Sequence, residues 1–186
     1  MSKVLVATVK PFAPQAITRM REVFAKAGHE MLLLEKYATV DELYAAVKDA
    51  DALVVRSDKV TSEVIAAAPQ LKIVVRGGAG YDNVNLPAAT DRGIVVENTP
   101  GQNSNAVAEL AIGMMLFQAR GKFNGKAGRE LKGKSLGIHG LGNVGQAIAR
   151  IANGLGMHVY SFDYKKRHRY CEKHGATALD DAQSLY

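Results

Sequence analysis

The chain is poor in cysteine and in aromatic residues: Cys171 is its one cysteine, it has no tryptophan, and aromatic residues make up 6% of its 186 positions. A single cysteine excludes an internal disulfide and suits a reducing compartment, so we expect a cytoplasmic protein. No apolar run is long enough to span a bilayer, and the segment MSKVLVATVK lacks the length and the cleavage motif of a signal peptide. We therefore expect no association with membranes.

Acidic residues are fewer than basic ones, 18 against 24, which gives a formal net charge of +6. The densest basic run is KKRHR at 165–169. Neither interleaved aromatic residues nor a zinc-ligand spacing accompanies this run, so nucleic acid is the least favoured partner and no metal site is expected. A solvated loop is the favoured interpretation, and contact with a cofactor phosphate is the alternative. The charge favours small anionic metabolites as ligands.

The first hundred residues alternate between strand and helix patterns. Short apolar runs predict strands at 3–9, 30–35, 52–55, 71–75 and 94–96. Helical spacing between them predicts helices at 14–28, 40–50, 62–68 and 86–92. Continuous apolar runs are typical of a parallel sheet that is covered on both faces. The expected fold class is α/β, and the chain is predicted to begin with a flavodoxin-like doubly wound domain.

A turn-rich junction at 98–105 leads into a predicted helix at 106–119, AVAELAIGMMLFQA, which is apolar nearly all round. Such a helix should be buried, either in the core of one domain or between domains or subunits. Residues 121–134 are rich in glycine and lysine and indicate a linker. We expect a flavodoxin-like substrate domain at 1–103, a connecting helix and linker at 104–134, and the first part of a Rossmann domain at 135–186.

The strongest motif lies at 135–163, where an apolar strand is followed by three spaced glycines, a helix, a second strand and an acid. Gly140 allows the tight turn that leaves the strand, Gly142 lets backbone amides approach a pyrophosphate, and Gly145 lets the helix pack closely on the sheet. The helix, predicted at 143–153, directs its positive end at the phosphates. Because every part is present in order, we interpret the motif as a dinucleotide-binding site, with a ligand-free glycine turn as the alternative.

Asp163 ends the second strand, 18 residues after Gly145. A carboxylate at this place can accept hydrogen bonds from the ribose hydroxyls of adenosine and would repel a 2′-phosphate. NAD is therefore the expected cofactor. Lys165, Lys166 and Arg167 weaken the preference over NADP, because a cation beside the ribose could compensate for a phosphate.

A second group of polar residues follows two neighbouring strands of the predicted sheet. Arg56 and Ser57 follow one strand, and Arg76 follows the next, where it opens a glycine-rich segment that contains Gly78. The carboxyl ends of parallel strands lie at one edge of a sheet, where open α/β folds bind ligands. Two arginines there could clamp a doubly anionic ligand, and backbone amides around Gly78 could hold a carboxylate or a phosphate. The alternative is a pair of solvated arginines.

Together these residues resemble the D-2-hydroxyacid dehydrogenase family. The resemblance rests on four segments in order: VVRSDKVTSEVI (54–65), VVRGGAGYDNVNL (74–86), RGIVVENTPGQNSNAVAEL (92–110) and LKGKSLGIHGLGNVGQAIA (131–149). It implies an NAD-dependent oxidoreductase that acts on a D-2-hydroxy acid, here a phosphorylated one. It also implies a homodimer formed through the nucleotide domain and its connecting helix.

The resemblance assigns roles to the residues of both candidate sites. It implies that Arg56, Ser57, Arg76 and Gly78 bind the substrate, with the arginines near its phosphate. For the cofactor, it implies that Ala79 faces the nicotinamide side, that the backbone of Asn143 and Val144 touches the pyrophosphate, and that Asp163 binds the ribose; Gly140, Gly142 and Gly145 complete this set. Two positions depart from the family pattern. Ala79 stands where a hydroxyl residue is common, and Asn143 where arginine or histidine is common.

The catalytic arginine, glutamate and histidine of the family all come later in the chain than Tyr186, so we expect no catalytic residue here. Residues 180–186 read as the first turns of a helix. We therefore expect the N-terminal portion of a longer dehydrogenase. The alternative is a non-catalytic NAD(H)-binding module that works with a partner.

Overall fold

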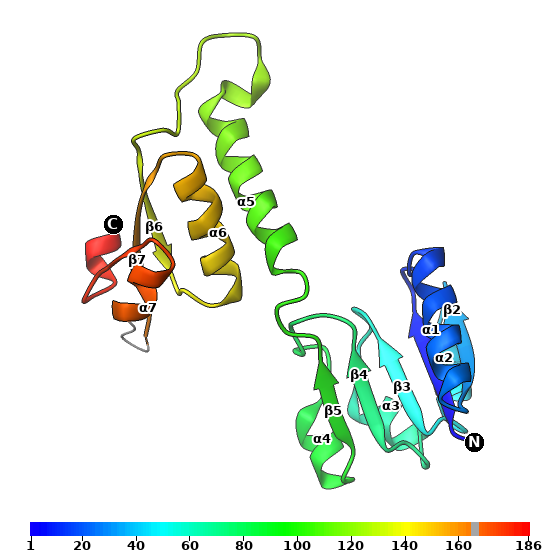
Figure 1. Ribbon diagram of the computed structural model, residues 1–186. Helices are drawn as coiled ribbons and strands as arrows, with labels where there is room; N and C mark the ends of the chain where they lie inside the picture. Colours follow the sequence, from blue (N-terminus) through cyan, green and yellow to red (C-terminus); the bar gives the residue numbers. More distant parts are fainter. Residues whose placement is uncertain (165–167) are drawn as a thin grey trace. The chain divides into compact units, whose positions relative to one another are not determined.

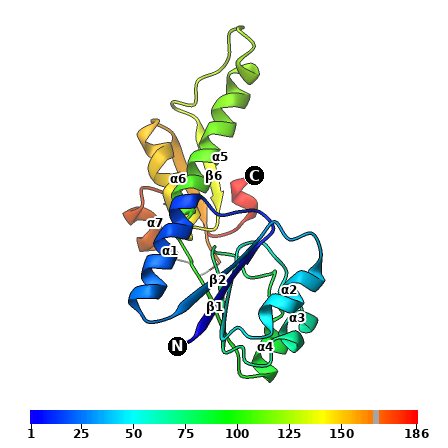
Figure 2. The ribbon, with the colours of Figure 1, turned by 90° about the vertical axis from the view of Figure 1, so that its right-hand side faces the viewer.

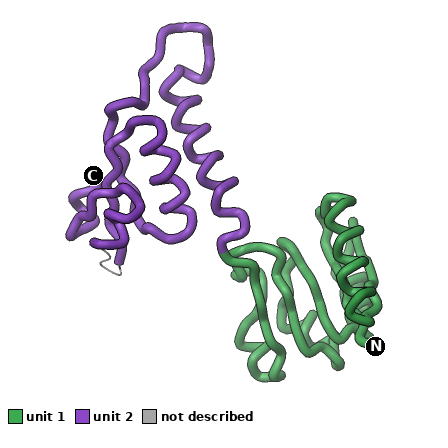
Figure 3. Tube along the Cα trace, in the orientation of Figure 1, with its two compact units in different colours: residues 1–100 green, residues 101–186 purple. Residues whose placement is uncertain are grey.

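The structure is a computed structural model that describes residues 1–164 and 168–186. Lys165, Lys166 and Arg167, which bear on the choice between NAD and NADP, lie outside the described residues. The chain divides into two compact units, residues 1–100 and 101–186 (Figure 3). Both units are built of parallel strands and helices, which confirms the expected α/β class. The domain boundaries expected at 103 and 134 stay predictions.

Unit 1, residues 1–100, contains a five-stranded parallel sheet in the order β2-β1-β3-β4-β5 (Figure 1). Its strands are β1 (Lys3–Thr8), β2 (Glu30–Glu35), β3 (Ala52–Val55), β4 (Ile73–Arg76) and β5 (Val95–Asn98). Its helices are α1 (Pro14–Lys26), α2 (Val40–Val47), α3 (Ser62–Ala67) and α4 (Leu86–Asp91). α2, α3 and α4 cover one face of the sheet and α1 lies on the other (Figure 2). This is the flavodoxin-like strand order that the sequence predicts.

The core of unit 1 lies between the sheet and the layer of α2, α3 and α4. Leu53 and Val55 of β3 and Val74 of β4 are fully buried there against Leu43 and Ile65 of the helices. On the opposite face only the β1 side is well covered, where Val6 is buried. The β5 side of that face is open, because α1 alone crosses it among the described residues, and Val95 is 53% exposed. The expectation that both faces are covered therefore holds for only part of the sheet.

Unit 2, residues 101–186, contains a three-stranded parallel sheet in the order β6-β7-β8. Its strands are β6 (Ser135–His139), β7 (His158–Phe162) and β8 (Thr177–Ala178). Its helices are α5 (Ser104–Ala119), α6 (Asn143–Gly154) and α7 (His168–Lys173), with the 3₁₀ turns η1 (Gly121–Phe123) and η2 (Gln183–Leu185). A separate core joins α5, α6 and α7 to the sheet through Ile112, Ile138, Ala149, Val159 and Cys171. The strand–helix–strand arrangement β6-α6-β7 carries the glycine motif.

α5 is not buried all round within unit 2, so it is not a plain core helix of one domain; burial between domains or subunits stays a prediction. Only Ser104, Ala108 and Ile112 of this helix are buried, because α5 packs on α6 along one side. The apolar side chains of the other side are 39–64% exposed: Val107, Leu110, Met114 and Phe117. The helix therefore presents an apolar surface that nothing else in unit 2 covers among the described residues.

The segment 180–186 does not begin an α-helix. It forms the 3₁₀ turn η2, in which the amides of Leu185 and Tyr186 donate to the carbonyls of Ala182 and Gln183, at 3.2 and 3.1 Å. Asp181 caps this turn by accepting hydrogen bonds from the amide and the hydroxyl of Ser184, at 2.8 and 2.9 Å.

Candidate functional site

The glycine turn connects β6 to α6 in unit 2. Gly140 takes a left-handed conformation, with φ 91°, which favours glycine at the point where the chain leaves the strand. A Cβ on Gly145 would lie 2.2 Å from the carbonyl oxygen of Gly140, so only glycine lets α6 pack this close to the turn. At Gly142 no heavy atom lies within 4 Å of the position of a Cβ. The backbone at Gly142 is therefore open to a ligand.

α6 begins directly after this open backbone. Asn143 is its first residue and is exposed, and Val144 follows it half-buried. The first amides of a helix have no acceptor inside the helix, and they carry the positive end of its dipole. The Asn143 side chain lies against the backbone of Gly101, since a Cβ on Gly101 would be 3.0 Å from its Nδ2 atom. Its backbone amide is left at the mouth of the turn.

Asp163 follows β7 and fixes the glycine turn through a hydrogen bond. Its Oδ2 atom accepts a hydrogen bond of 2.8 Å from the backbone amide of Leu141. The amide of Gly140 also donates to the carbonyl of Phe162, at 2.7 Å, so the turn is held by both residues at the end of β7. The structure thus brings together the glycine turn, the first residues of α6 and the acid. The spacing of the motif predicted this neighbourhood, but it gave no signal of the bond between Asp163 and Leu141.

These features suit a dinucleotide. Open backbone at Gly142 admits a pyrophosphate, the amides at the start of α6 suit its charge, and a carboxylate lies where a ribose would follow.

His139, beside the turn, packs edge-on against Phe162 with ring centroids 5.5 Å apart. Cys171 is buried behind β7, and burial raises the pKa of its thiol, which therefore stays protonated at neutral pH.

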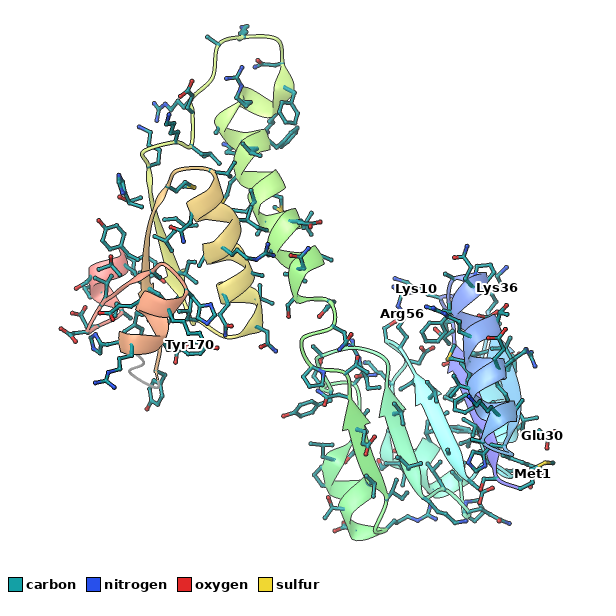
Figure 4. All side chains as sticks on the ribbon, viewed as in Figure 1. Met1, Lys10, Glu30, Lys36, Arg56 and Tyr170 are labelled. Atoms are coloured by element: carbon teal, nitrogen blue, oxygen red, sulfur yellow. The ribbon has the colours of Figure 1, made fainter. Side chains whose placement is uncertain are left out.

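The arginines predicted for unit 1 lie at one edge of its sheet. β3 and β4 pair with Val55 opposite Arg76, so Arg56 leaves β3 next to the end of β4. Arg56 and Ser57 are exposed. Arg56 lies at the same end of the sheet as Lys10 and Lys36, which follow β1 and β2 (Figure 4). None of these three cations makes an ion pair within 4.0 Å in the described part of the chain.

Arg76 is half-buried and folds back over its own loop. A Cβ on Gly78 would lie 1.5 Å from the Nη1 atom of Arg76, so the guanidinium occupies the space that glycine leaves free. The Nε atom of Arg76 is buried and has no hydrogen-bond partner among the described residues. The structure thus explains Gly78 as a support for Arg76, a role that the sequence pattern did not indicate.

The end of β5 fixes the loop that follows Arg76. The amide of Thr99 donates to the carbonyl of Gly78 at 3.0 Å, and Nδ2 of Asn98 donates to the carbonyl of Ala79 at 2.6 Å. The amide of Gly78 already donates to the carbonyl of Arg76, at 2.8 Å. Within the described chain, the amides of Ala79 and Gly80 make no hydrogen bond. These two amides, rather than that of Gly78, are therefore the open donors of the loop.

Sequence reasoning missed one buried polar residue at this edge, Asp58. It lies between β3 and α3 and is 8% exposed. Its Oδ1 atom accepts hydrogen bonds from the amide of Val9 at 2.7 Å and from the Tyr37 hydroxyl at 2.8 Å. Burial and the contact with Asp58 raise the pKa of Tyr37, so the hydroxyl remains a donor. The one signal in the sequence is an aspartate three residues after a strand end.

The described residues contain no group of three or more His, Cys, Asp or Glu side chains that could hold a metal ion. No helix within 1–164 or 168–186 is long and apolar enough to cross a bilayer.

Comparison with known proteins gives matches along nearly the whole chain. Residues 4–182 match the sequence model of the family described as D-isomer specific 2-hydroxyacid dehydrogenase, catalytic domain. A D-3-phosphoglycerate dehydrogenase of Archaeoglobus fulgidus is 40% identical over 196 residues, which cover 96% of this chain and 35% of that protein. A hydroxypyruvate reductase of Thermotoga maritima is 42% identical over 151 residues, which cover 74% of this chain and 49% of that protein.

The solved structures include a similar chain, the NAD⁺-bound 3-phosphoglycerate dehydrogenase of Entamoeba histolytica. It is 44% identical, with a TM-score of 0.90, and the match covers 100% of this chain and 59% of that one. This chain therefore spans between 35% and 59% of the length of these three relatives.

Proposed function

The chain belongs to the D-isomer specific 2-hydroxyacid dehydrogenases, and we propose that it serves the NAD-dependent oxidation of 3-phosphoglycerate to 3-phosphohydroxypyruvate. The observation that carries the proposal is the glycine turn of unit 2, with its open backbone at Gly142 and its amide at Leu141 bonded to Asp163. The names of the relatives from Archaeoglobus and Entamoeba support this substrate. A cytoplasmic location and a role in serine biosynthesis are part of the proposal.

For the cofactor, we assign the pyrophosphate to the amides of Gly142, Asn143 and Val144. Gly140 and Gly145 give the turn its shape, and Asp163 accepts the ribose hydroxyls. When bound, NAD supplies the hydride acceptor. The carboxylate of Asp163 disfavours a 2′-phosphate, so NAD is preferred to NADP.

For the substrate, we assign the phosphate to Arg56, Ser57 and Arg76 at the edge formed by β3 and β4. Guanidinium groups bind phosphate oxygens through two parallel hydrogen bonds, which suits a doubly charged group. The open amides of Ala79 and Gly80 suit the carboxylate. A small unphosphorylated 2-hydroxy acid is the competing substrate class, because one relative is a hydroxypyruvate reductase.

The proposal is tested by calorimetric titration with NADH and by a 3-phosphoglycerate oxidation assay on the same sample of the 186-residue chain. Binding with turnover supports the full proposal. NADH binding without turnover favours the alternative, a non-catalytic NAD(H)-binding module that works with a partner. Absence of NADH binding contradicts both.

The phosphate assignment has its own test in Arg56→Ala and Arg76→Ala. Each change should weaken binding of 3-phosphoglycerate by about tenfold or more, because a charge-assisted contact is lost. Binding of unphosphorylated D-glycerate should change little. Equal affinity of wild type and variants for 3-phosphoglycerate would count against the clamp.

We also propose that the chain forms a homodimer through α5. The exposed side chains Val107, Leu110, Met114 and Phe117 are spaced three and four residues apart, so they form one apolar stripe along the helix. A contiguous stripe of this kind is typical of a subunit interface. Light scattering should give the mass of a dimer for the wild type and of a monomer for Leu110→Glu. Gln15→Glu on α1 serves as the control and should remain dimeric.

A further inference from the structure

We propose that Asp58 is a positioning residue for the anion-binding edge of unit 1. Its buried carboxylate joins the segment after β3 to those after β1 and β2, and its main-chain carbonyl holds the loop after β4. Two of these segments carry Arg56 and the open amides. The inference rests on the proposed function of that edge. It adds a residue that makes no contact with the substrate itself.

The contacts of Asp58 reach every neighbouring strand end. Its Oδ1 atom binds the amide of Val9, which follows β1, and the hydroxyl of Tyr37, which follows β2. Its carbonyl oxygen accepts a hydrogen bond of 2.7 Å from Nδ2 of Asn83, in the loop after β4. Asp58 itself follows β3. In the sheet order β2-β1-β3-β4, one residue thus ties four consecutive strand ends.

The hydrogen bond between Asp58 and Val9 joins β1 to β3, the two strands between which the connecting helices change from one face of the sheet to the other. The chain leaves β1 toward α1 on one face of the sheet and leaves β3 toward α3 on the other. A crevice normally opens between the carboxyl ends of two such strands, and ligands of open α/β sheets bind in it. Here the Asp58 carboxylate bridges the two strand ends at 2.7 Å. The bridge fixes the segment of Arg56 against β1.

A second set of bonds extends the bridge to the glycine-rich loop. The amide of Val60 donates to the carbonyl of Asn83 at 2.8 Å, and the amide of Asn85 donates to the carbonyl of Val60 at 2.9 Å. Residues 58–60 and 83–85 are therefore joined side by side. A shift of Asp58 would move Arg56 and Ser57, which precede it, and would pull on the loop that carries the amides of Ala79 and Gly80.

The negative charge of Asp58 indicates that the residue positions neighbouring chain segments and does not bind the anionic ligand. A carboxylate beside an anion site repels the ligand, and burying a polar group is costly unless it is fully hydrogen-bonded. The Oδ2 atom has no hydrogen-bond partner among the described residues, although it is buried. A buried polar group kept at this cost calls for an explanation, and two short hydrogen bonds to separate segments supply one.

The test compares four variants of the full chain by calorimetric titration with 3-phosphoglycerate and with NADH, and by thermal unfolding. Asp58→Ala should weaken binding of 3-phosphoglycerate by about tenfold, as expected when binding groups lose their placement. Asp58→Asn keeps an oxygen that accepts both hydrogen bonds, so affinity should stay within about threefold of wild type. Tyr37→Phe removes one donor and should give an intermediate loss. NADH binding, in unit 2, should not change.

Asp51→Ala is the matched control. Asp51 also joins two strands, by accepting from the amide of Lys3 at 2.9 Å and from Nζ of Lys72 at 2.8 Å, but at the amino end of the sheet. Its loss should lower the melting temperature and leave 3-phosphoglycerate affinity intact. If Asp58→Ala does not fold, the 3-phosphoglycerate affinity of Tyr37→Phe tests the inference instead.

Four results would overturn the inference. Equal affinity in wild type, Asp58→Ala and Tyr37→Phe would show that the contacts do not position the site. An equal loss of 3-phosphoglycerate affinity in Asp51→Ala would show that the effect comes from lower stability of unit 1. Tighter binding in both Asp58 variants would show that Asp58 acts only through the repulsion between its charge and the ligand. A wild type that binds NADH but no 3-phosphoglycerate would reject the proposed function of the edge, and the role of Asp58 with it.

Discussion

Gly78 matters through the side chain that lies over it. Gly78→Ala would put a methyl group where the guanidinium of Arg76 now lies, 1.5 Å from Nη1. Arg76 must then swing away, and 3-phosphoglycerate affinity should fall by about tenfold through loss of one charged contact. The control is Gly77→Ala, whose Cβ would meet its nearest atom, the Val55 carbonyl oxygen, at an ordinary 3.6 Å. Titration should separate the two variants, and equal affinities would contradict this role of Gly78.

Alanine substitutions at two glycines of the turn should have different effects on stability and on NADH affinity. Gly145→Ala brings a methyl group to 2.2 Å from the Gly140 carbonyl oxygen, so it should lower both the stability of unit 2 and its NADH affinity. Gly142→Ala meets no atom within 4 Å and has an ordinary φ of −71°, so the fold should be unaffected while the methyl group obstructs the pyrophosphate. Thermal unfolding and NADH titration together distinguish them. A loss of stability in Gly142→Ala would contradict this assignment.

At the residue level, the sequence predicted neighbourhoods but not contacts. Motif spacing predicted that Arg56 and Arg76 share a sheet edge, and the pairing of Val55 with Arg76 confirms it. The same spacing could not predict that Asp163 binds the Leu141 amide or that Asp58 joins Val9 to Tyr37. Those bonds link side chains to groups that are 21 to 49 residues away, and no local pattern encodes such pairs.

At the scale of single elements, the start of α2 gives a prediction about pH. Glu42 accepts hydrogen bonds from the amides of Thr39 and Ala38, and these bonds lower the pKa of its carboxyl below the ordinary 4.5. Because the pKa is lower in the folded state, the contribution of Glu42 to stability is full above pH 4.5 and is lost as the pH falls through the folded pKa. The stability gap between wild type and Glu42→Gln should therefore be widest at neutral pH.

The measurement is the melting temperature of both proteins from pH 7 down to about pH 3, the range over which an exposed carboxyl titrates. We expect the two curves to converge on the acid side. A gap that stays constant over this range would show that the charge of Glu42 does not support the capping of α2.

Strands with distinct apolar runs were predicted closely, and short elements without them were not. β2, which is half-buried throughout, and β3, which is buried at alternate residues, have the predicted bounds. β8 has only two residues and α7 has six, and neither carries a pattern long enough to detect. For α5, the alternative of a core helix within one domain was wrong, because apolarity alone does not say whether a helix is covered by its own domain or by another surface.

At the scale of the whole chain, each unit has a core of its own. The buried cluster of unit 1 and that of unit 2 have no residue in common. Leu53→Ala, at a fully buried position of β3, should lower the melting transition of unit 1 by an amount equivalent to about 2–5 kcal/mol and leave that of unit 2 in place. NADH should raise the transition of unit 2 alone. Calorimetry with and without NADH tests this, and a single transition that responds to both changes would contradict it.

The hydrogen bond from the Leu141 amide to Asp163 sets a limit on redesign of the cofactor preference. If Asp163 binds the ribose as proposed, a change to NADP requires its replacement, because a carboxylate there repels a 2′-phosphate. Here that exchange would also release the amide that fixes the glycine turn, so affinity for the pyrophosphate would fall for both cofactors. An engineered NADP-dependent form of this chain would therefore need a second substitution that gives the Leu141 amide a new acceptor.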